Sequence, residues 1–238
     1  METSSIESTR KNISKVDDIL TDGKTEVSFR CTYYIKDFNP TQILNYTNEV
    51  SINEEIISKI KIINNNKKED LIFTKRFQKL GFNIIDFSIE GQLTNMSSMF
   101  NNCSSLKNIQ FISFPTSQVN SFNAMFQNCL ELEYLDLSNF DTSNIIDMGW
   151  MFNNCKKLKE IKGINNFNTS KLVRMSSMFQ ECNELDHLDL SNFNTKNVKK
   201  MEYMFARCYW IDLTFLVKWK WGNRIYWIFL KCRIFFFG

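Results

Sequence analysis

A Met-Phe pair followed by a cysteine three residues after the phenylalanine occurs five times in this chain. The cysteines, which are separated by 26, 26, 27 and 26 residues, are Cys103, Cys129, Cys155, Cys182 and Cys208. A fixed period of this length predicts stacked units in which each repeat buries its apolar face against its neighbours. Arrays of this kind usually bind other molecules, so the period favours a binding scaffold over an enzyme.

The segment around each Met-Phe pair has the apolar spacing of a short helix. In the second repeat, Phe122, Met125, Phe126 and Cys129 stand at positions i, i+3, i+4 and i+7, which is one face of an α-helix. We therefore expect helices of about two turns whose repeated apolar residues form a structural core ladder. The members of this predicted core ladder are Met99, Phe100, Cys103, Met125, Phe126, Cys129, Met151, Phe152, Cys155, Met178, Phe179, Cys182, Met204, Phe205 and Cys208.

A second segment of each repeat alternates apolar and polar residues, which is typical of a half-buried strand. In residues 132–140, Leu135 and Leu137 alternate with polar neighbours. The corresponding copies are residues 106–114, 158–167 and 185–193. The third copy carries one extra residue near Gly163, which accounts for the 27-residue step and predicts a bulge.

The polar positions of these strand segments predict an exposed face, because side chains alternate between the two faces of a strand. We name this predicted partner-binding surface the strand face. Its first row is Asn108, Tyr134, Glu160 and His187, and its second row is Gln110, Asp136, Lys162 and Asp189. Tyr134 and His187 are the favoured contacts, because exposed aromatic side chains are enriched in interfaces. The alternative interpretation is that both rows are only a solvated surface.

The chain divides into four predicted parts. Residues 1–25 are polar and are predicted to be disordered. Residues 26–91 contain several strand-like stretches, among them 56–63, and predict a small β-rich capping module whose last strand covers the first repeat. Five repeats occupy residues 92–213, and an atypical aromatic and basic tail occupies residues 214–238.

The repeats resemble a known family. Leu-Asp-Leu-Ser-Asn-Phe-Asn-Thr-Lys-Asn-Val at 188–198, followed by Met-Glu-Tyr-Met-Phe-Ala-Arg-Cys at 201–208, is similar to the BspA-type leucine-rich repeat, also catalogued as a mycoplasma repeat of unknown function. The resemblance implies an α/β repeat solenoid, a leucine-rich-repeat-like stack of short parallel strands and short helices. It offers no catalytic residues. Members are often surface proteins of bacteria and protozoa, and some are adhesins or antigens.

Charge and composition narrow the expected partners. Residues 92–208 carry 11 Lys/Arg and 11 Asp/Glu, which argues against a nucleic-acid groove. The chain has seven cysteines without a Cys-x-x-Cys pair, and its single histidine is His187, so we expect no metal site and no cofactor. We expect a protein ligand instead.

No apolar stretch approaches the roughly 20 residues that span a bilayer, so we expect no transmembrane segment. Residues 1–18 lack the apolar core of a secretory signal. The missing signal favours an intracellular location, whereas the family resemblance implies the cell surface.

The last thirty residues differ from the repeats in composition. Residues 209–238 carry five Lys/Arg against one acidic residue, and aromatic residues such as Trp219 and Trp221 crowd among them. Three interpretations stay open. The tail can be a native cap over Leu213, a basic and aromatic segment that contacts a membrane surface, or the product of a reading-frame change that replaced further repeats.

These patterns together predict a non-catalytic scaffold for protein–protein interaction, and the family resemblance narrows this to a surface antigen or adhesin. The altered tail motivates an alternative, which is a truncated or frame-disrupted repeat paralogue without selected activity. An enzyme is the remote alternative. His187 has Asp186 and Asp189 nearby, but neighbours on a strand alternate faces, and neither a nucleophile motif nor a phosphate-binding loop accompanies them.

Overall fold

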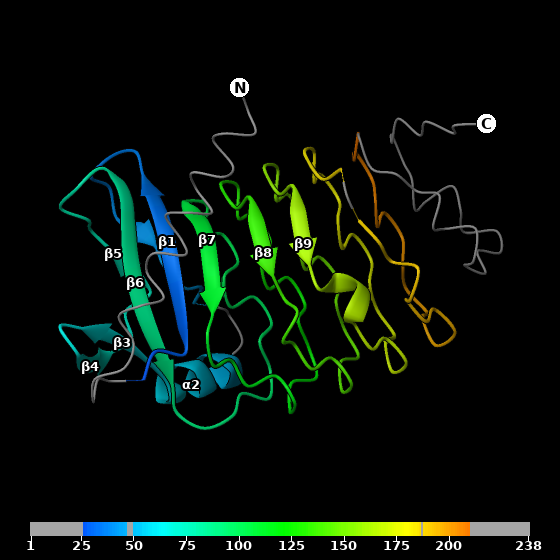
Figure 1. Cartoon of the computed structure of the whole chain (residues 1–238), viewed down its shortest axis with the longest axis horizontal. Coiled ribbons are helices and arrows are strands. Elements are labelled where there is room, and N and C mark those ends of the chain that lie inside the picture. The colour runs from blue at the N-terminus through cyan, green and yellow to red at the C-terminus, as the bar shows by residue number, and fades with distance from the viewer. Residues whose placement is uncertain (1–25, 47–49, 187, 210–238) are drawn as a thin grey trace.

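The computed structural model describes residues 26–46, 50–186 and 188–209. Its centre is a seven-stranded mixed sheet with the strand order β4-β3-β6-β1-β7-β8-β9 (Figure 1). The strands of this sheet are β1 (Phe29–Ile35), β3 (Ile60–Asn64), β4 (Lys67–Asp70), β6 (Gly81–Ile89), β7 (Leu106–Phe111), β8 (Tyr134–Asp136) and β9 (Glu160–Lys162). The short strands β2 (Thr41–Gln42) and β5 (Thr74–Lys75) pair separately, and α2 (Val50–Lys59) runs directly into β3.

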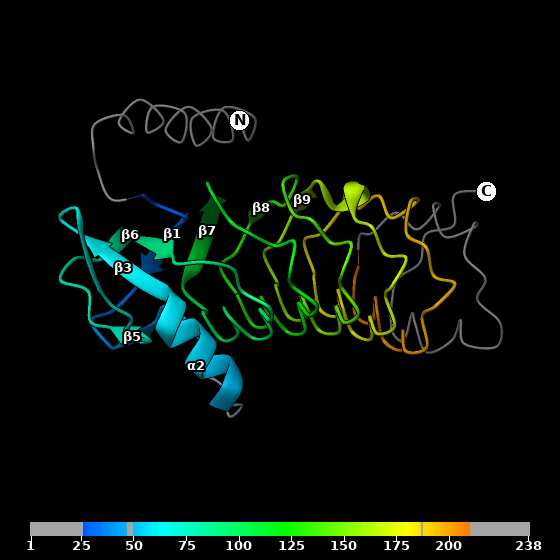
Figure 2. The ribbon, with the colours of Figure 1, turned by 90° about the horizontal axis from the view of Figure 1, so that it is seen from below.

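The predicted α/β repeat solenoid, a leucine-rich-repeat-like stack of short parallel strands and short helices, is wrong. The chain forms one mixed sheet, in which β7, β8 and β9 pair in parallel and the other strands pair antiparallel. Among the described residues the only α-helix is α2, which lies before the repeats. The Met-Phe-x-x-Cys segments are successive tight turns, which Figure 2 shows as similar loops lying side by side.

The backbone conformation explains why these segments are not helices. In the first repeat, Ser98 has a φ of 59° and Asn102 has a φ of 62°. Both values lie in the left-handed region, which interrupts a right-handed helix. The other repeats place a left-handed residue at the same two positions, namely Ala124 and Asn128, Trp150 and Asn154, Ser177 and Glu181, and Tyr203 and Arg207.

The hydrogen bonds of these segments alternate between two partners. The amides of Ser98 and Phe100 donate to carbonyl oxygens of the next repeat, at 2.8 and 2.9 Å. The amide of Met99, between them, donates to the carbonyl of Met96 three residues earlier, at 3.3 Å. The hydrogen bonds from an amide of one repeat to a carbonyl oxygen of the next recur through the fourth repeat, so they join each repeat to its successor.

The i, i+3, i+4, i+7 spacing nevertheless predicts correctly which side chains are buried in the core. All fifteen residues of the core ladder are buried, with at most 1% of the surface of any of them exposed. The rings of Phe100, Phe126, Phe152, Phe179 and Phe205 stack in one column, with centroids 5.4–5.7 Å apart. Successive i-to-i+3 turns and a helix therefore bury the same sequence positions, and the left-handed φ values and the hydrogen bonds distinguish these turns from a helix.

The first repeat joins the N-terminal strands through β1. This strand pairs antiparallel with β6 on one side and with β7 on the other, placing Arg30 opposite both Asp86 and Gln110. The strand beside the first repeat is thus β1, and not the last strand of the preceding segment. The inward side chains of β1, such as Phe29 and Tyr33, are fully buried and continue the core into this part of the molecule.

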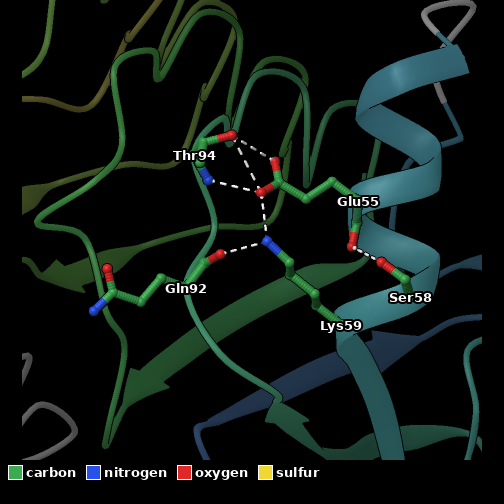
Figure 3. Close-up of polar contacts among 5 residues, drawn as sticks. All are labelled: Glu55, Ser58, Lys59, Gln92 and Thr94. Carbon is green, nitrogen blue, oxygen red and sulfur yellow. Dashed lines mark hydrogen bonds and ion pairs between the residues drawn. The ribbon is translucent and has the colours of Figure 1, made fainter.

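Residues 56–63, which the sequence predicts as a strand, divide between α2 and β3. A network of polar contacts attaches α2 to the chain that follows β6 (Figure 3). The Glu55 carboxylate accepts from the Thr94 amide at 2.9 Å and from the Lys59 ammonium at 2.9 Å, and Lys59 also donates to the Gln92 carbonyl at 2.6 Å. Burial acts to raise the pKa of Glu55, but these bonds outweigh it and the pKa is lowered.

The extra residue of the third repeat forms a short 3₁₀ turn, η2 (Ile164–Asn166), instead of the predicted strand bulge. Gly163 precedes this turn with a φ of 81°. A Cβ atom at this position would lie 2.4 Å from the Cα of Ser138, so only glycine fits against the neighbouring repeat.

Candidate interaction surface

The strand face lies on the side of β7, β8 and β9 that points away from the core. Ile109, Leu135 and Ile161 point inward from these strands and are buried. The residues on either side of them alternate outward, as the pleat of a strand requires. Asn108, Gln110, Tyr134 and Glu160 are half-buried there, and Asp136 and Lys162 are exposed.

Strand register brings the two predicted rows together across neighbouring repeats. Asn108 pairs with Tyr134, and Tyr134 pairs with Glu160, which builds the first row. In the second row Asp136 pairs with Lys162, and Gln110 lies two residues beyond Asn108 on β7. Six of the eight predicted residues therefore share one continuous surface.

The two remaining residues, Asp189 and His187, follow β9 in the sequence. Asp189 is exposed and accepts a hydrogen bond from the Ser191 amide at 2.9 Å, which repeats the bond from Ser138 to Asp136 at 3.0 Å. The segment that contains Asp189 is not a strand. His187, a favoured contact residue in the sequence, lies outside the described residues.

An ion pair joins neighbouring repeats on the strand face. The Lys162 ammonium lies 2.7 Å from the Asp136 carboxylate. Burial acts to raise the pKa of Asp136, but the hydrogen bonds from Lys162 and Ser138 outweigh it and the pKa lies below its ordinary value. Asp136 is therefore a carboxylate at neutral pH, and this part of the surface presents charges of both signs.

The sequence interpretation missed the continuation of this surface onto β1 and β6. Arg30 binds Asp86 through two hydrogen bonds, of 2.6 and 2.8 Å, and the pair lies beside Gln110. Thr32 pairs with Asn108 on one side and Ile84 on the other, so the first row also extends across these strands. The alternating apolar and polar residues at 26–35 and 83–89 indicate strands. Nothing in the sequence indicates that one of these strands pairs with β7.

The repeat cysteines lie in the interior behind the strand face, and all five are buried. Cys129, Cys155, Cys182 and Cys208 each direct Sγ to the carbonyl oxygen of the Met-Phe phenylalanine in the preceding repeat, at 2.9–3.1 Å. Burial raises the pKa of the Cys103, Cys129, Cys155 and Cys182 thiols well above their ordinary value. A thiol that stays protonated is a poor nucleophile and a poor metal ligand, so these groups act in packing.

The described residues hold neither a cluster of metal ligands nor a membrane-spanning helix. Within residues 26–46, 50–186 and 188–209, no three His, Cys, Asp or Glu side chains are grouped so that they could hold a metal ion. In the same part of the chain no helix is both long and apolar enough to span a bilayer. The aromatic and basic tail at 214–238, with its three interpretations, and residues 1–25 lie outside the described residues.

These features define a repeat-containing protein built on a mixed sheet, with the repeated residues inside and the varied ones on the strand face. The profile of a family described as "Mycoplasma protein of unknown function, DUF285" matches residues 72–162 and residues 132–225, together more than half of the chain. The chain belongs to this family. No curated protein and no solved structure shows a significant match to this chain. The family match supports a mycoplasma-type repeat, which is a coarser statement than a BspA-type leucine-rich repeat.

Proposed function

We propose that this chain is a non-catalytic scaffold for protein–protein interaction and that the strand face is its contact surface. The observation that carries the proposal is the contrast between two sets of positions on the same three strands. The inward positions hold the similar residues Ile109, Leu135 and Ile161. The outward positions beside them change chemistry from one repeat to the next.

The outward changes are large. The first row runs from an amide at Asn108 through a phenol at Tyr134 to a carboxylate at Glu160. In the second row the amide of Gln110 is followed by the carboxylate of Asp136 and the ammonium of Lys162. A constant backbone that presents different groups at a fixed spacing suits recognition of one particular protein surface.

The chemistry of the strand face indicates the kind of partner. Tyr134 is the large amphipathic side chain at its centre, and such residues often dominate binding energy when a partner buries them. The surrounding groups include a carboxylate and an ammonium that are already paired with one another. We expect a protein partner with a mixed polar surface around one apolar pocket for the Tyr134 ring.

Affinity capture with the full chain tests this proposal. The wild-type chain and a row variant, Tyr134→Ala with Asp136→Ala and Lys162→Ala, are each immobilised and exposed to the same surface-protein extract. Changing Asp136 and Lys162 together removes both partners of their ion pair. A partner retained by the wild type is expected to bind the row variant at least roughly tenfold more weakly, as loss of a central aromatic contact predicts.

A matched control carries Lys156→Ala and Lys196→Ala, which are exposed residues outside the strands. The control is expected to capture the same partner as the wild type. If every captured partner binds the wild type and the row variant with equal affinity, the strand face is not the contact surface.

The resemblance to BspA-type repeats supports a narrower proposal, in which the chain is a surface antigen or adhesin-like protein. Protease treatment of intact source cells distinguishes the locations. Digestion of the chain without lysis would support a surface role, and full protection until lysis would exclude adhesion as its native role.

A further inference from the structure

Exposed apolar side chains gather where β1 ends and β6 begins. Phe38, Leu80 and Phe82 are 56%, 45% and 61% exposed. Phe38 lies in the loop that follows β1, Leu80 directly precedes β6, and Phe82 is the second residue of β6. We name this surface the β1–β6 tip. Side chains of this size are usually buried, so three exposed ones at this end of two paired strands indicate a surface that binds another molecule.

The contacts of the two loops hold the β1–β6 tip together. Ile35, the last residue of β1, pairs with Gly81, the first residue of β6. The Arg76 guanidinium donates to the Phe38 carbonyl oxygen at 3.2 Å, which ties one loop to the other. The Phe82 ring contacts the Tyr34 ring of β1, with centroids 5.1 Å apart. These contacts position the apolar side chains outward without burying them.

The loop before β6 also keeps a defined shape. Gly81 has a φ of 83°, which turns the chain sharply into the strand. The Asn83 side-chain amide donates to the carbonyl oxygens of Lys79 and Gly81, at 2.9 and 3.1 Å. Leu80 is therefore held at the point of the turn, between two anchored residues.

The charge around the β1–β6 tip is positive. Residues 71–85 contain Lys75, Arg76 and Lys79 and no Asp or Glu. In residues 36–46 the single acidic residue is Asp37, whose carboxylate accepts the Asn39 amide of its own loop. The repeats differ, since residues 92–208 balance their charges. The β1–β6 tip thus combines apolar side chains with basic ones and almost no acidic ones.

We propose that the β1–β6 tip binds the surface of an anionic lipid bilayer. Phe38, Leu80 and Phe82 enter the boundary between headgroups and acyl chains, and Lys75, Arg76 and Lys79 lie near the lipid phosphates. Amphipathic surfaces that bind at bilayer interfaces combine apolar burial with basic residues in this way. The charge complementarity between these basic residues and anionic headgroups favours lipid over a protein partner. This proposal uses none of the eight residues that define the strand face and does not depend on them.

Vesicle co-sedimentation of the full chain tests the proposal. The vesicles contain phosphatidylcholine, alone or with about one third phosphatidylglycerol. We expect binding to the anionic vesicles, and weaker binding in about 0.5 M than in about 0.1 M NaCl, because salt screens the basic residues. An apolar variant (Phe38→Ser, Leu80→Ser, Phe82→Ser) and a charge variant (Lys75→Glu, Arg76→Glu, Lys79→Glu) are each expected to bind roughly tenfold or more weakly.

Two controls separate the β1–β6 tip from other surfaces. Ile146→Ser with Lys196→Glu changes an exposed apolar and an exposed basic residue of the repeats, and Lys218→Glu with Lys220→Glu changes the tail. Both are expected to bind like the wild type, and circular dichroism of every variant verifies folding. The proposal is overturned if the wild type does not bind anionic vesicles, if the two tip variants bind as well as it does, or if the apolar variant only converts a dimer into a monomer.

Discussion

Each repeat has two sides that differ in what they repeat. On the Met-Phe-x-x-Cys side the same residues recur, and the Phe rings stack at 5.4–5.7 Å within a fully buried column. On the strand side the inward residues recur and the outward ones differ, as Tyr134 and Glu160 do. The comparison indicates that repeated residues serve packing between repeats, whereas the varied residues are available for recognition.

The largest effect is expected from a cavity on the packed side. Phe152 lies in the middle of the ring column, 5.7 Å from Phe126 and 5.6 Å from Phe179. Phe152→Ala is expected to lower the free energy of unfolding by about 3–5 kcal/mol, because a buried aromatic ring is replaced by a void. Urea titration measures the change. The exposed Ile146→Ala is the control, and equal losses in the two variants would contradict the packing role of the column.

The next effect concerns the close approach of two repeats at Gly163. Gly163→Ala combines a left-handed φ with a Cβ atom 2.4 Å from the Cα of Ser138. It is expected to destabilise the protein by about 2–4 kcal/mol, from strain and overpacking. Gly91→Ala, at the similar φ of 81° but with open space around it, separates the two causes. A smaller loss at Gly163 than at Gly91 would show that the contact with Ser138 is not tight.

The asparagine before each of the first three repeat cysteines forms a polar ladder on the packed side. Asn128 donates to Asn102 and accepts from Asn154, both at 2.7 Å, and its φ is 61°. Asn128→Ala is expected to cost about 1–2 kcal/mol, since it loses both bonds and the residue type that tolerates this conformation. Thermal unfolding compares it with Asn128→Gly, which keeps the conformation. The glycine variant should be the more stable of the two, and the reverse order would assign the whole effect to the bonds.

Glu131 links the repeats to the chain after β1 and makes stability depend on pH. Its carboxylate accepts from Lys36 at 2.6 Å and from Lys157 at 2.7 Å. Burial acts to raise the pKa of Glu131, but these two lysines outweigh it, so the pKa in the folded chain is below the ordinary 4.5. A lowered pKa stabilises the folded chain above pH 4.5, and this contribution is lost as the pH falls through the lowered value.

Glu131→Gln removes the titrating carboxyl and tests that dependence. The Lys36 and Lys157 side chains are 62% and 42% exposed, so solvent screening reduces the expected loss at pH 7 to about 1 kcal/mol or less. Urea titrations from pH 7 to pH 3 should show the difference between wild type and variant shrink toward zero at low pH. A difference that stays constant over this range would assign the loss to shape and not to charge.

The smallest effect is expected on the strand face. Asp136→Ala with Lys162→Ala removes an ion pair whose side chains are 53% and 65% exposed. Such surface pairs contribute little, so the free energy of unfolding should change by less than about 0.5 kcal/mol. Urea titration measures this change, and a loss above about 2 kcal/mol would mean that the strand face is needed for folding and is not reserved for recognition.

The sequence was sufficient to find the period and the side chains that face inward, because apolar spacing responds directly to burial. It was not sufficient to find the conformation. Met96, Met99, Phe100 and Cys103 have helical spacing, yet their backbone makes turns that bond to the next repeat. Ser98, Ala124, Trp150, Ser177 and Tyr203 share the left-handed position but are of four different residue types, so no single residue type marked this position in the sequence.

Long-range pairing was the second limit of the sequence. The apolar run at 56–63 gave no indication that a helix ends at Lys59 and a strand begins at Ile60. The pairing of β1 with β7 joins residues roughly 80 positions apart in the chain. For that reason the strand-face rows were predictable within the repeats, whereas Arg30, Asp86 and the β1–β6 tip were not.

The central claim is that the repeated segments are turns joined by backbone bonds between repeats. Hydrogen-bond scalar couplings in an isotope-labelled sample test it directly. The amides of Ser98, Phe100 and Asn102 should couple to the carbonyl carbons of Asn123, Met125 and Gln127. Couplings from these amides to carbonyls four residues earlier would instead show helices and would contradict the account.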